Sequence, residues 1–349
     1  MKKVFLILAA FVFLGFVFFF SEERFEDGLT EVKYWIINPE EIRYLPPKNS
    51  SEFSKFISSN LNFQKKETGL KTSPLFTIKG IDSDSKEEYL YEGNYNVKNL
   101  FTELSVISTK SITAANPDLL NKFEISIEKS PSIEILKSSK LQKKIYLGEE
   151  TRDNSRRYLL SDKDLITASS HIFQKLTNSS LDFRERNYTR FSEFDLVRMV
   201  IQGEGIRLNV ENNPETKNGI QTSKWFKILN GKYRINPSDS ANLYPYLQSF
   251  KVEIYPDDSN GEGFAVAREL TKTETLVQVD IFLINGLHYK IKLFPKVVLK
   301  NKSYYPVVKE VENFFIESPT YTSEELVVKL ISLLKKIQSD PEWTEPKGK

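Results

Sequence analysis

The sequence predicts an α+β protein in which an N-terminal transmembrane anchor precedes two similar repeats with mostly antiparallel sheets. Short runs that alternate apolar and polar residues recur along the chain, which is the period of half-buried strands. Helical patterns are fewer than these runs, whereas a doubly wound parallel fold needs a helix after nearly every strand. One long apolar run stands at the N-terminus, ahead of these patterns.

These patterns divide the chain into four expected parts. Residues 1–21 form an uncleaved signal-anchor, residues 22–185 the first α+β repeat, and residues 186–338 the second repeat. Residues 339–349 form a disordered tail. Repeats of this length indicate a duplicated domain, because the repeats of solenoid proteins run only about 20–50 residues.

The composition excludes several classes of protein. The 349 residues include 49 Lys and Arg against 47 Asp and Glu, a net charge of +2. A charge this close to zero argues against a broad nucleic-acid surface, so we expect no nucleic-acid partner. The chain has no Cys, which rules out disulfides, thiolate zinc sites and thiol nucleophiles. With 40% hydrophobic residues, it can still bury a core.

The anchor is predicted from residues 4–20, an unbroken apolar run. As a helix this run spans about 25 Å, close to the lower limit for crossing a bilayer. Two lysines precede it, which predicts that the N-terminus stays in the cytoplasm and the rest of the chain lies outside. A cleaved signal peptide is one alternative, but Phe18 and Phe20 fit poorly in a cleavage site that needs small residues. A buried core helix is the other.

Residues 277–294 predict an antiparallel hairpin. Residues 277–283 and 289–293 each alternate apolar and polar side chains. Asn285-Gly286 lies between the two runs, and this dipeptide favours the tight turn of a hairpin.

Four segments have apolar residues at helical spacing, namely residues 97–104, 163–176, 243–250 and 325–337. Asn236-Pro237 predicts the N-cap and first turn of the third helix, in which Pro245 would cause a kink or an early end. A capping box at residues 322–325 precedes the fourth helix.

The predicted elements occur in the same order twice, which is the basis for the duplication. The first pass contains a hairpin at 34–44, a strand at 76–81, the helix at 97–104, strands at 124–127, 144–147 and 157–160, and the helix at 163–176. The second pass contains strands at 196–200, 206–210 and 225–229, the helix at 243–250, strands at 277–283, 289–294 and 304–308, and the helix at 325–337. Two unrelated α+β modules are the alternative.

An ordered set of short motifs runs through the middle of the chain. It comprises Tyr146-Leu147-Gly148, Arg157-Tyr158-Leu159, the helix that ends at Leu176, Asp182-Phe183-Arg184-Glu185-Arg186, residues 191–200 and 206–210, and Lys224-Trp225. This set resembles domain-of-unknown-function family 4340 over roughly residues 30–300. The sequence departs from the family pattern at Phe76, where the first repeat would have Trp, and in a longer loop at residues 212–220.

The resemblance implies an extracytoplasmic auxiliary protein associated with gliding-motility-type ABC transporters. It places the chain in the inner (cytoplasmic) membrane of a bacterium as a single-pass protein, with the C-terminal domain on the periplasmic side. We therefore expect a non-enzymatic, membrane-anchored accessory component that contacts the membrane through residues 4–20 and binds an envelope protein, with an ABC-type transporter component as the suspected partner. The alternatives are a polysaccharide-binding receptor or adhesin and an envelope hydrolase.

Catalytic residues, cofactors and metals are not expected. His171 and His288 are the two histidines, and the sequence has no His-Glu-x-x-His motif that would place a zinc site on a helix. A Ser-His-Asp arrangement stays open because triads are assembled in space, yet no Gly-x-Ser-x-Gly elbow is present.

Arg184, Arg186 and Arg190 crowd the joint between the repeats, together with Asp182 and Glu185. Because Arg suits bidentate contacts with carboxylates and phosphates, these three are the candidate docking residues for an acidic partner or a lipid head group. The alternative is a salt-bridged hinge, in which at least one Arg pairs between the repeats.

Three aromatic residues near the anchor bear on the receptor alternative. Tyr34, Trp35 and Tyr44 would face the membrane interface or a sugar polymer in that case, and they would pack into the core otherwise.

Overall fold

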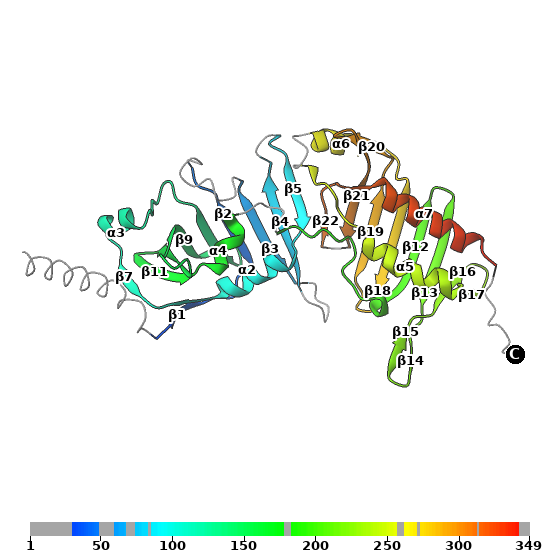
Figure 1. Ribbon diagram of the computed structural model, residues 1–349, viewed down its shortest axis with the longest axis horizontal. Coiled ribbons are helices and arrows are strands. Elements are labelled where there is room, and N and C mark those ends of the chain that lie inside the picture. The colour runs from blue at the N-terminus through cyan, green and yellow to red at the C-terminus, as the bar shows by residue number, and fades with distance from the viewer. Residues whose placement is uncertain are drawn as a thin grey trace, which may run out of the picture. The chain divides into compact units, whose positions relative to one another are not determined.

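Antiparallel sheets dominate the computed structural model, and the predicted α+β class is confirmed (Figure 1). The structure describes residues 30–48, 59–67, 74–82, 85–177, 183–256, 262–270, 273–312 and 314–341. The predicted anchor at residues 1–21 and all of the predicted tail after residue 341 lie outside these ranges. Within them, no helix is both long enough and apolar enough to cross a membrane.

The chain divides into two units of dense internal contact. The first takes its described residues from Met1–Asn60 and Tyr95–Asp182, and the second from Leu61–Asn94 and Phe183–Lys349. One division lies close to the expected boundary at residue 185. Residues 61–94, however, were expected in the first repeat and belong to the second unit. Their backbone explains this, because Asn94 N donates to Phe183 O over 2.8 Å and Glu185 N donates to Glu92 O over 2.9 Å.

The first unit contains one larger sheet, one strand pair and short helices. The order in the larger sheet is β2 (Glu41–Leu45), β8 (Ser132–Lys137), β9 (Lys140–Glu150), β10 (Arg156–Ser161), β11 (Asp164–Ser169) and β7 (Ile112–Ala114). The pair is β1 (Val32–Ile36) with β6 (Val106–Thr109). The helices are α2 (Tyr95–Ser105), α3 (Pro117–Lys122) and α4 (His171–Gln174), which continues as the 3₁₀ turn η1 (Lys175–Thr177).

The second unit contains a meander, a ten-stranded sheet and a separate hairpin. The meander is β3 (Leu61–Lys66), β4 (Leu75–Ile81) and β5 (Glu88–Glu92). The sheet order is β17 (Lys232–Arg234), β16 (Trp225–Ile228), β13 (Ile206–Asn212), β12 (Leu196–Gly203), β18 (Val277–Leu283), β19 (His288–Leu293), β21 (Lys302–Val311) and β20 (Val297–Leu299), and β22 (Phe315–Ile316) and β23 (Thr320–Ser323) also pair with β21. The hairpin is β14 (Glu215–Lys217) with β15 (Ile220–Thr222).

The helices of the second unit are α5 (Pro237–Ser249), α6 (Glu262–Leu270) and α7 (Glu324–Ser339), and the 3₁₀ turn η3 (Glu193–Asp195) precedes β12. Figure 1 shows α7 crossing one face of the ten-stranded sheet, and α5 packs against α7. The sheet buries every second residue, as β18 does with Val277, Val279, Ile281 and Leu283. The core of this unit therefore lies between the helices and that face of the sheet.

Three predicted elements are confirmed in detail. Strands β18 and β19 form the expected hairpin, with Gly286 at a φ of 85° in its turn. Helix α2 buries the four predicted residues Val97, Leu100, Phe101 and Leu104. Helix α5 begins at Pro237 after the Asn236 cap, but it continues through Pro245 to Ser249 and is not shortened there.

The predicted helix at 163–176 is wrong over most of its length. Residues 164–169 form β11, which pairs with β10 across a tight turn that holds Asp162 at a φ of 54°. Aspartate tolerates this left-handed conformation, and the β-branched Ile166 and Thr167 suit a strand. Hairpin formation with β10 therefore outweighs the helical spacing, and α4 starts only at His171.

The predicted hairpin at 34–44 is wrong as well. Strands β1 and β2 exist, but β1 pairs with β6 and β2 pairs with β8. Ile37 N, directly after β1, donates to Ser105 O, which directs β1 toward the end of α2.

The predicted strand at 124–127 and the predicted capping box are also wrong. Glu124 follows the end of α3 with a φ of 54°, and Ile125 N donates back to Leu120 O, so this segment closes a helix. At α7, Thr322 still pairs within β23, so the N-cap is Ser323, one residue later, and its side chain makes no capping bond.

The two halves of the chain share an order of elements. Strands β8, β9, β10 and β11 form consecutive antiparallel pairs before α4, and β18, β19, β21 and β23 do so before α7. A meander also precedes the earlier helix in each half: β3, β4 and β5 before α2, and β12, β13, β16 and β17 before α5. Helix α2 contacts α4, as α5 contacts α7.

Candidate functional site

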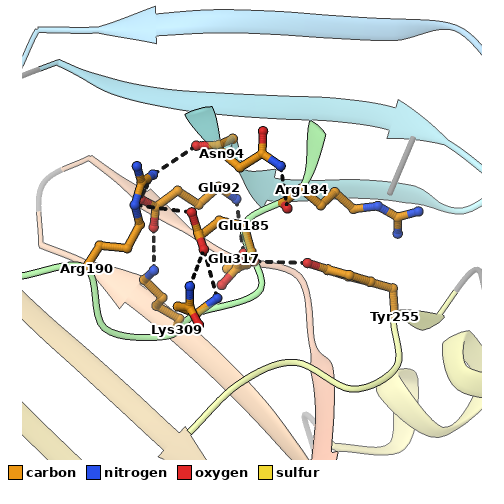
Figure 2. Close-up of polar contacts among 10 residues, drawn as sticks. Glu92, Asn94, Arg184, Glu185, Arg190, Tyr255, Lys309 and Glu317 are labelled. Atoms are coloured by element: carbon orange, nitrogen blue, oxygen red, sulfur yellow. Dashed lines mark hydrogen bonds and ion pairs between the residues drawn. The ribbon is translucent and has the colours of Figure 1, made fainter. Parts of the chain in front are cut away.

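Five charged side chains of the second unit meet in one place, although they lie far apart in the sequence (Figure 2). This group, the Glu92 cluster, consists of Glu92, Glu185, Arg190, Lys309 and Glu317. Strand β5 supplies Glu92, β21 supplies Lys309, and the segment after β22 supplies Glu317. The remaining two come from the segment 183–190.

Lys309 and Glu92 form the buried centre of the cluster. Their side chains are only 1% and 3% exposed, and Lys309 Nζ donates to Glu92 Oε2. Lys309 lies on the apolar side of β21, next to Val307 and Val311. Burial lowers the pKa of Lys309, but the nearby carboxylates of Glu92 and Glu317 more than offset this and raise it. Lys309 is therefore a buried cation, and Glu92 is its counter-ion.

Glu317 is the third buried member. Its Oε1 accepts a hydrogen bond from Glu92 N over 3.0 Å, and its own N donates to Lys309 O over 2.7 Å. Burial raises the pKa of Glu317 to about 7, although Lys309 and the bond from Glu92 N act in the opposite direction. Burial thus favours the neutral form of Glu317.

Arg190 connects the cluster with the surface. Its side chain is 38% exposed, and it donates from Nη1 to Glu92 Oε1 over 3.3 Å and to Gly93 O over 3.2 Å. Its Nε lies 3.2 Å from Glu185 Oε2. Glu185 also accepts two bonds from Asn187, so both of its carboxylate oxygens are engaged.

Arg184 occupies a separate, aromatic site. Its guanidinium carbon lies 4.2 Å from the ring centre of Tyr255 and 5.4 Å from that of Tyr91. Figure 2 shows this guanidinium pointing away from the carboxylates of the cluster. Tyr255 in turn donates its hydroxyl to Glu185 O over 2.9 Å. Arg184 is 2% exposed, and we assign it a packing role.

The three predicted docking residues therefore have different surroundings. Arg184 is buried, Arg186 is exposed, and Arg190 is partly exposed and paired with two glutamates. Arg190 forms an ion pair with Glu92, but both residues belong to the second unit, so a pair of Arg184 or Arg186 between the repeats stays a prediction. Docking stays a prediction for Arg186 and Arg190.

Sequence reasoning missed Glu92, Lys309 and Glu317. One signal was available for Lys309, because a charged residue interrupts the alternate apolar positions Val307 and Val311 of a strand pattern. Its partners could not be identified in the same way, since Glu92 is 217 residues away in the sequence.

The two histidines have no common environment. His171 is exposed and lies 3.7 Å from Glu103. His288 Nε2 lies 2.8 Å from Asp280 Oδ1, and its Nδ1 lies 2.7 Å from Glu312 Oε2. In the described part of the chain, no three His, Asp or Glu side chains are placed to hold a metal ion.

The aromatic residues considered for sugar binding are mostly enclosed. Tyr44 is fully buried, and Trp35 is 7% exposed and donates its indole N–H to Leu104 O. Tyr34 donates to Asp164 Oδ2 over 2.7 Å, and burial together with this bond raises its pKa to about 12. These contacts favour core packing over a sugar-binding surface.

Comparison with known proteins gives one family. The family model described as Domain of unknown function (DUF4340) matches residues 83–261, just over half of the chain. No curated protein matches the chain. The matched range includes Glu92 and the whole segment 183–190, whereas Lys309 and Glu317 lie after it.

Proposed function

From the premise that this chain belongs to the DUF4340 family, we propose that it is a non-enzymatic, membrane-anchored accessory component of a bacterial cell-envelope assembly. In this proposal residues 4–20 cross the inner membrane once, and the two units lie on the periplasmic side. The ectodomain binds another envelope protein, and a component of an ABC-type transporter is the proposed partner.

The proposal that the ectodomain binds a protein rests on one observation, which is that buried contacts fix the backbone of the segment 183–190. Buried side chains fix it on both sides of Arg186: Arg184 against tyrosines, Glu185 in the Glu92 cluster, and Tyr188 through a 2.7 Å bond to Thr320. Arg186 O also accepts a 2.7 Å bond from Val252 N. The exposed Arg186 side chain thus projects from a fixed backbone.

A fixed backbone favours recognition because less conformational freedom is lost when the side chain binds. A guanidinium also matches a carboxylate in a bidentate geometry. We propose that Arg186, with the half-exposed Arg190 beside it, docks an acidic group of the partner protein.

Charge reversal at Arg186 tests this function. The full-length protein is purified in mild detergent, and the proteins that accompany it are identified and quantified by mass spectrometry. We expect transporter components with the wild type and at least a tenfold lower yield of them with Arg186→Glu, at an unchanged melting temperature. Lys98→Glu, an exposed charge reversal on α2, is the matched control and keeps the partner. Equal partner yields for wild type and Arg186→Glu would contradict the docking role.

The anchor is tested by the mass of the mature protein. Because Phe18 and Phe20 obstruct a signal-peptidase site, protein extracted from membranes should begin near Met1. Intact-mass measurement or N-terminal sequencing checks this. A mature start near Ser21 contradicts the anchor.

The shared order of elements supports a duplicated α+β domain as the origin of the ectodomain. In this proposal α2 and α5 are equivalent, and so are α4 and α7. An experimental structure in which the halves superpose with α2 and α5 on the same side of their sheets is the expected result, and helices on opposite sides would refute the duplication.

A further inference from the structure

The Glu92 cluster contains more acidic than basic groups. Three carboxylates, on Glu92, Glu185 and Glu317, face two cations, on Arg190 and Lys309. Glu92 engages both cations, and Glu185 shares Arg190. If all five groups are ionised, the cluster holds one negative charge in excess. A buried excess charge costs free energy, which protonation of one carboxyl group removes.

Glu317 is the carboxyl group best placed to carry that proton. It is 3% exposed, and Oε1 already accepts a hydrogen bond from Glu92 N. A neutral carboxylic acid keeps an oxygen for this bond without adding charge. Glu92, in contrast, faces two cations, with Lys309 Nζ at one carboxylate oxygen and Arg190 Nη1 at the other.

The same group ties β5 to the rest of the second unit. Glu317 accepts from Glu92 N, and the adjoining Ser318 exchanges two 2.8 Å bonds with Leu90, one through its hydroxyl and one through its N–H. Lys66, at the end of β3, also donates a hydrogen bond from Nζ to Phe314 O. Residues 314–318 are thus a strip to which residues 61–94 attach.

We propose that Glu317 acts as a clamp between β5 and residues 315–318. The strength of this contact depends on whether the Glu317 carboxyl group is protonated. The clamp is closed when Glu317 is protonated and loosens when Glu317 is ionised. The groups that act on Glu317 are Lys309 of β21, Glu92 of β5, and Glu185 of the segment 183–190. Burial is the main cause of the raised pKa values of Tyr188 and Tyr255, and the charge of Glu317 raises them further. Both tyrosines therefore stay neutral.

The direction of the pH effect follows from the proton affinity of the two states. The pKa of Glu317 is about 7 in the closed form, above the ordinary value of 4.5 that applies once water reaches the group. The closed form therefore binds more protons between these values, and it loses stability as pH rises through this range. Below about pH 4.5, the protonation of Glu317 makes its full contribution to the stability of the closed form.

Hydrogen–deuterium exchange of the full-length protein in detergent tests the clamp. Protection of β5 amides, corrected for intrinsic exchange, should fall at least tenfold from pH 5 to pH 8, and protection of β18 and β19 should change less. Glu317→Gln should remove this difference between pH values. Glu310→Gln is the control, because Glu310 lies on β21 but pairs with Lys292 in a position where its side chain is 19% exposed, and it should behave like the wild type.

Two results overturn the clamp. One is that the protection of β5 amides depends on pH in the same way in the wild type and in Glu317→Gln. The other is that protection falls equally in β5 and in β18 and β19 as the pH rises. If Glu317→Gln does not fold, the carboxyl carbon of Glu317 in the wild type is titrated by NMR. A midpoint near 7 supports the clamp, and a midpoint near 4.5 overturns it. These outcomes do not depend on the docking role of Arg186.

Discussion

Lys309→Met is expected to lower the free energy of unfolding by about 3–5 kcal/mol, because it leaves Glu92 buried with one of its two cations removed. Methionine keeps most of the volume of lysine, so the loss reports the charge and not a cavity. Chemical denaturation of the full-length protein in mild detergent, followed by tryptophan fluorescence, measures it.

The matched control for Lys309→Met is Lys292→Met. Lys292 forms its ion pair with Glu310 while 28% exposed, so its loss should cost less than about 1 kcal/mol. Similar losses at the two positions would show that burial does not distinguish the Glu92 cluster from a surface pair.

Arg184→Ala is expected to destabilise the protein by about 2–5 kcal/mol, as large-to-small replacements in a core do. The substitution opens a cavity beside Tyr255 and Tyr91 and removes the cation above their rings. Arg186→Ala, two residues later and exposed, should change the free energy of unfolding by no more than about 0.5 kcal/mol. Equal effects of the two substitutions in the same denaturation experiment would refute the assignment of Arg184 to packing.

The sequence predicted those elements whose signal is local. Helix α2 could be recognised because Val97, Leu100, Phe101 and Leu104 are spaced for one helix face, and Asn285-Gly286 marks a turn by its own backbone preference. Residues 164–169 show the limit of such signals. Their apolar spacing suits a helix, and only pairing with β10 makes them a strand.

The candidate site was predictable only in part, because its members come together through long-range pairing. The arginines of the segment 183–190 stand close in the sequence, so their clustering was visible, but their environments were not. Which arginine is buried depends on Tyr255 and Tyr91, which lie on distant segments. The pairing of Glu92 with Lys309 requires β5 and β21 to meet, and no local pattern encodes this.

The central claim is that the buried ion pair of Glu92 with Lys309 is the structural centre of the Glu92 cluster, and a double-mutant cycle on these two residues tests it most directly. Glu92→Gln, Lys309→Met and the double variant are compared with the wild type by denaturation. The account predicts a coupling free energy of about 2–3 kcal/mol, with the double variant more stable than Lys309→Met alone. A coupling below about 0.5 kcal/mol, with independent losses that simply add, would contradict it.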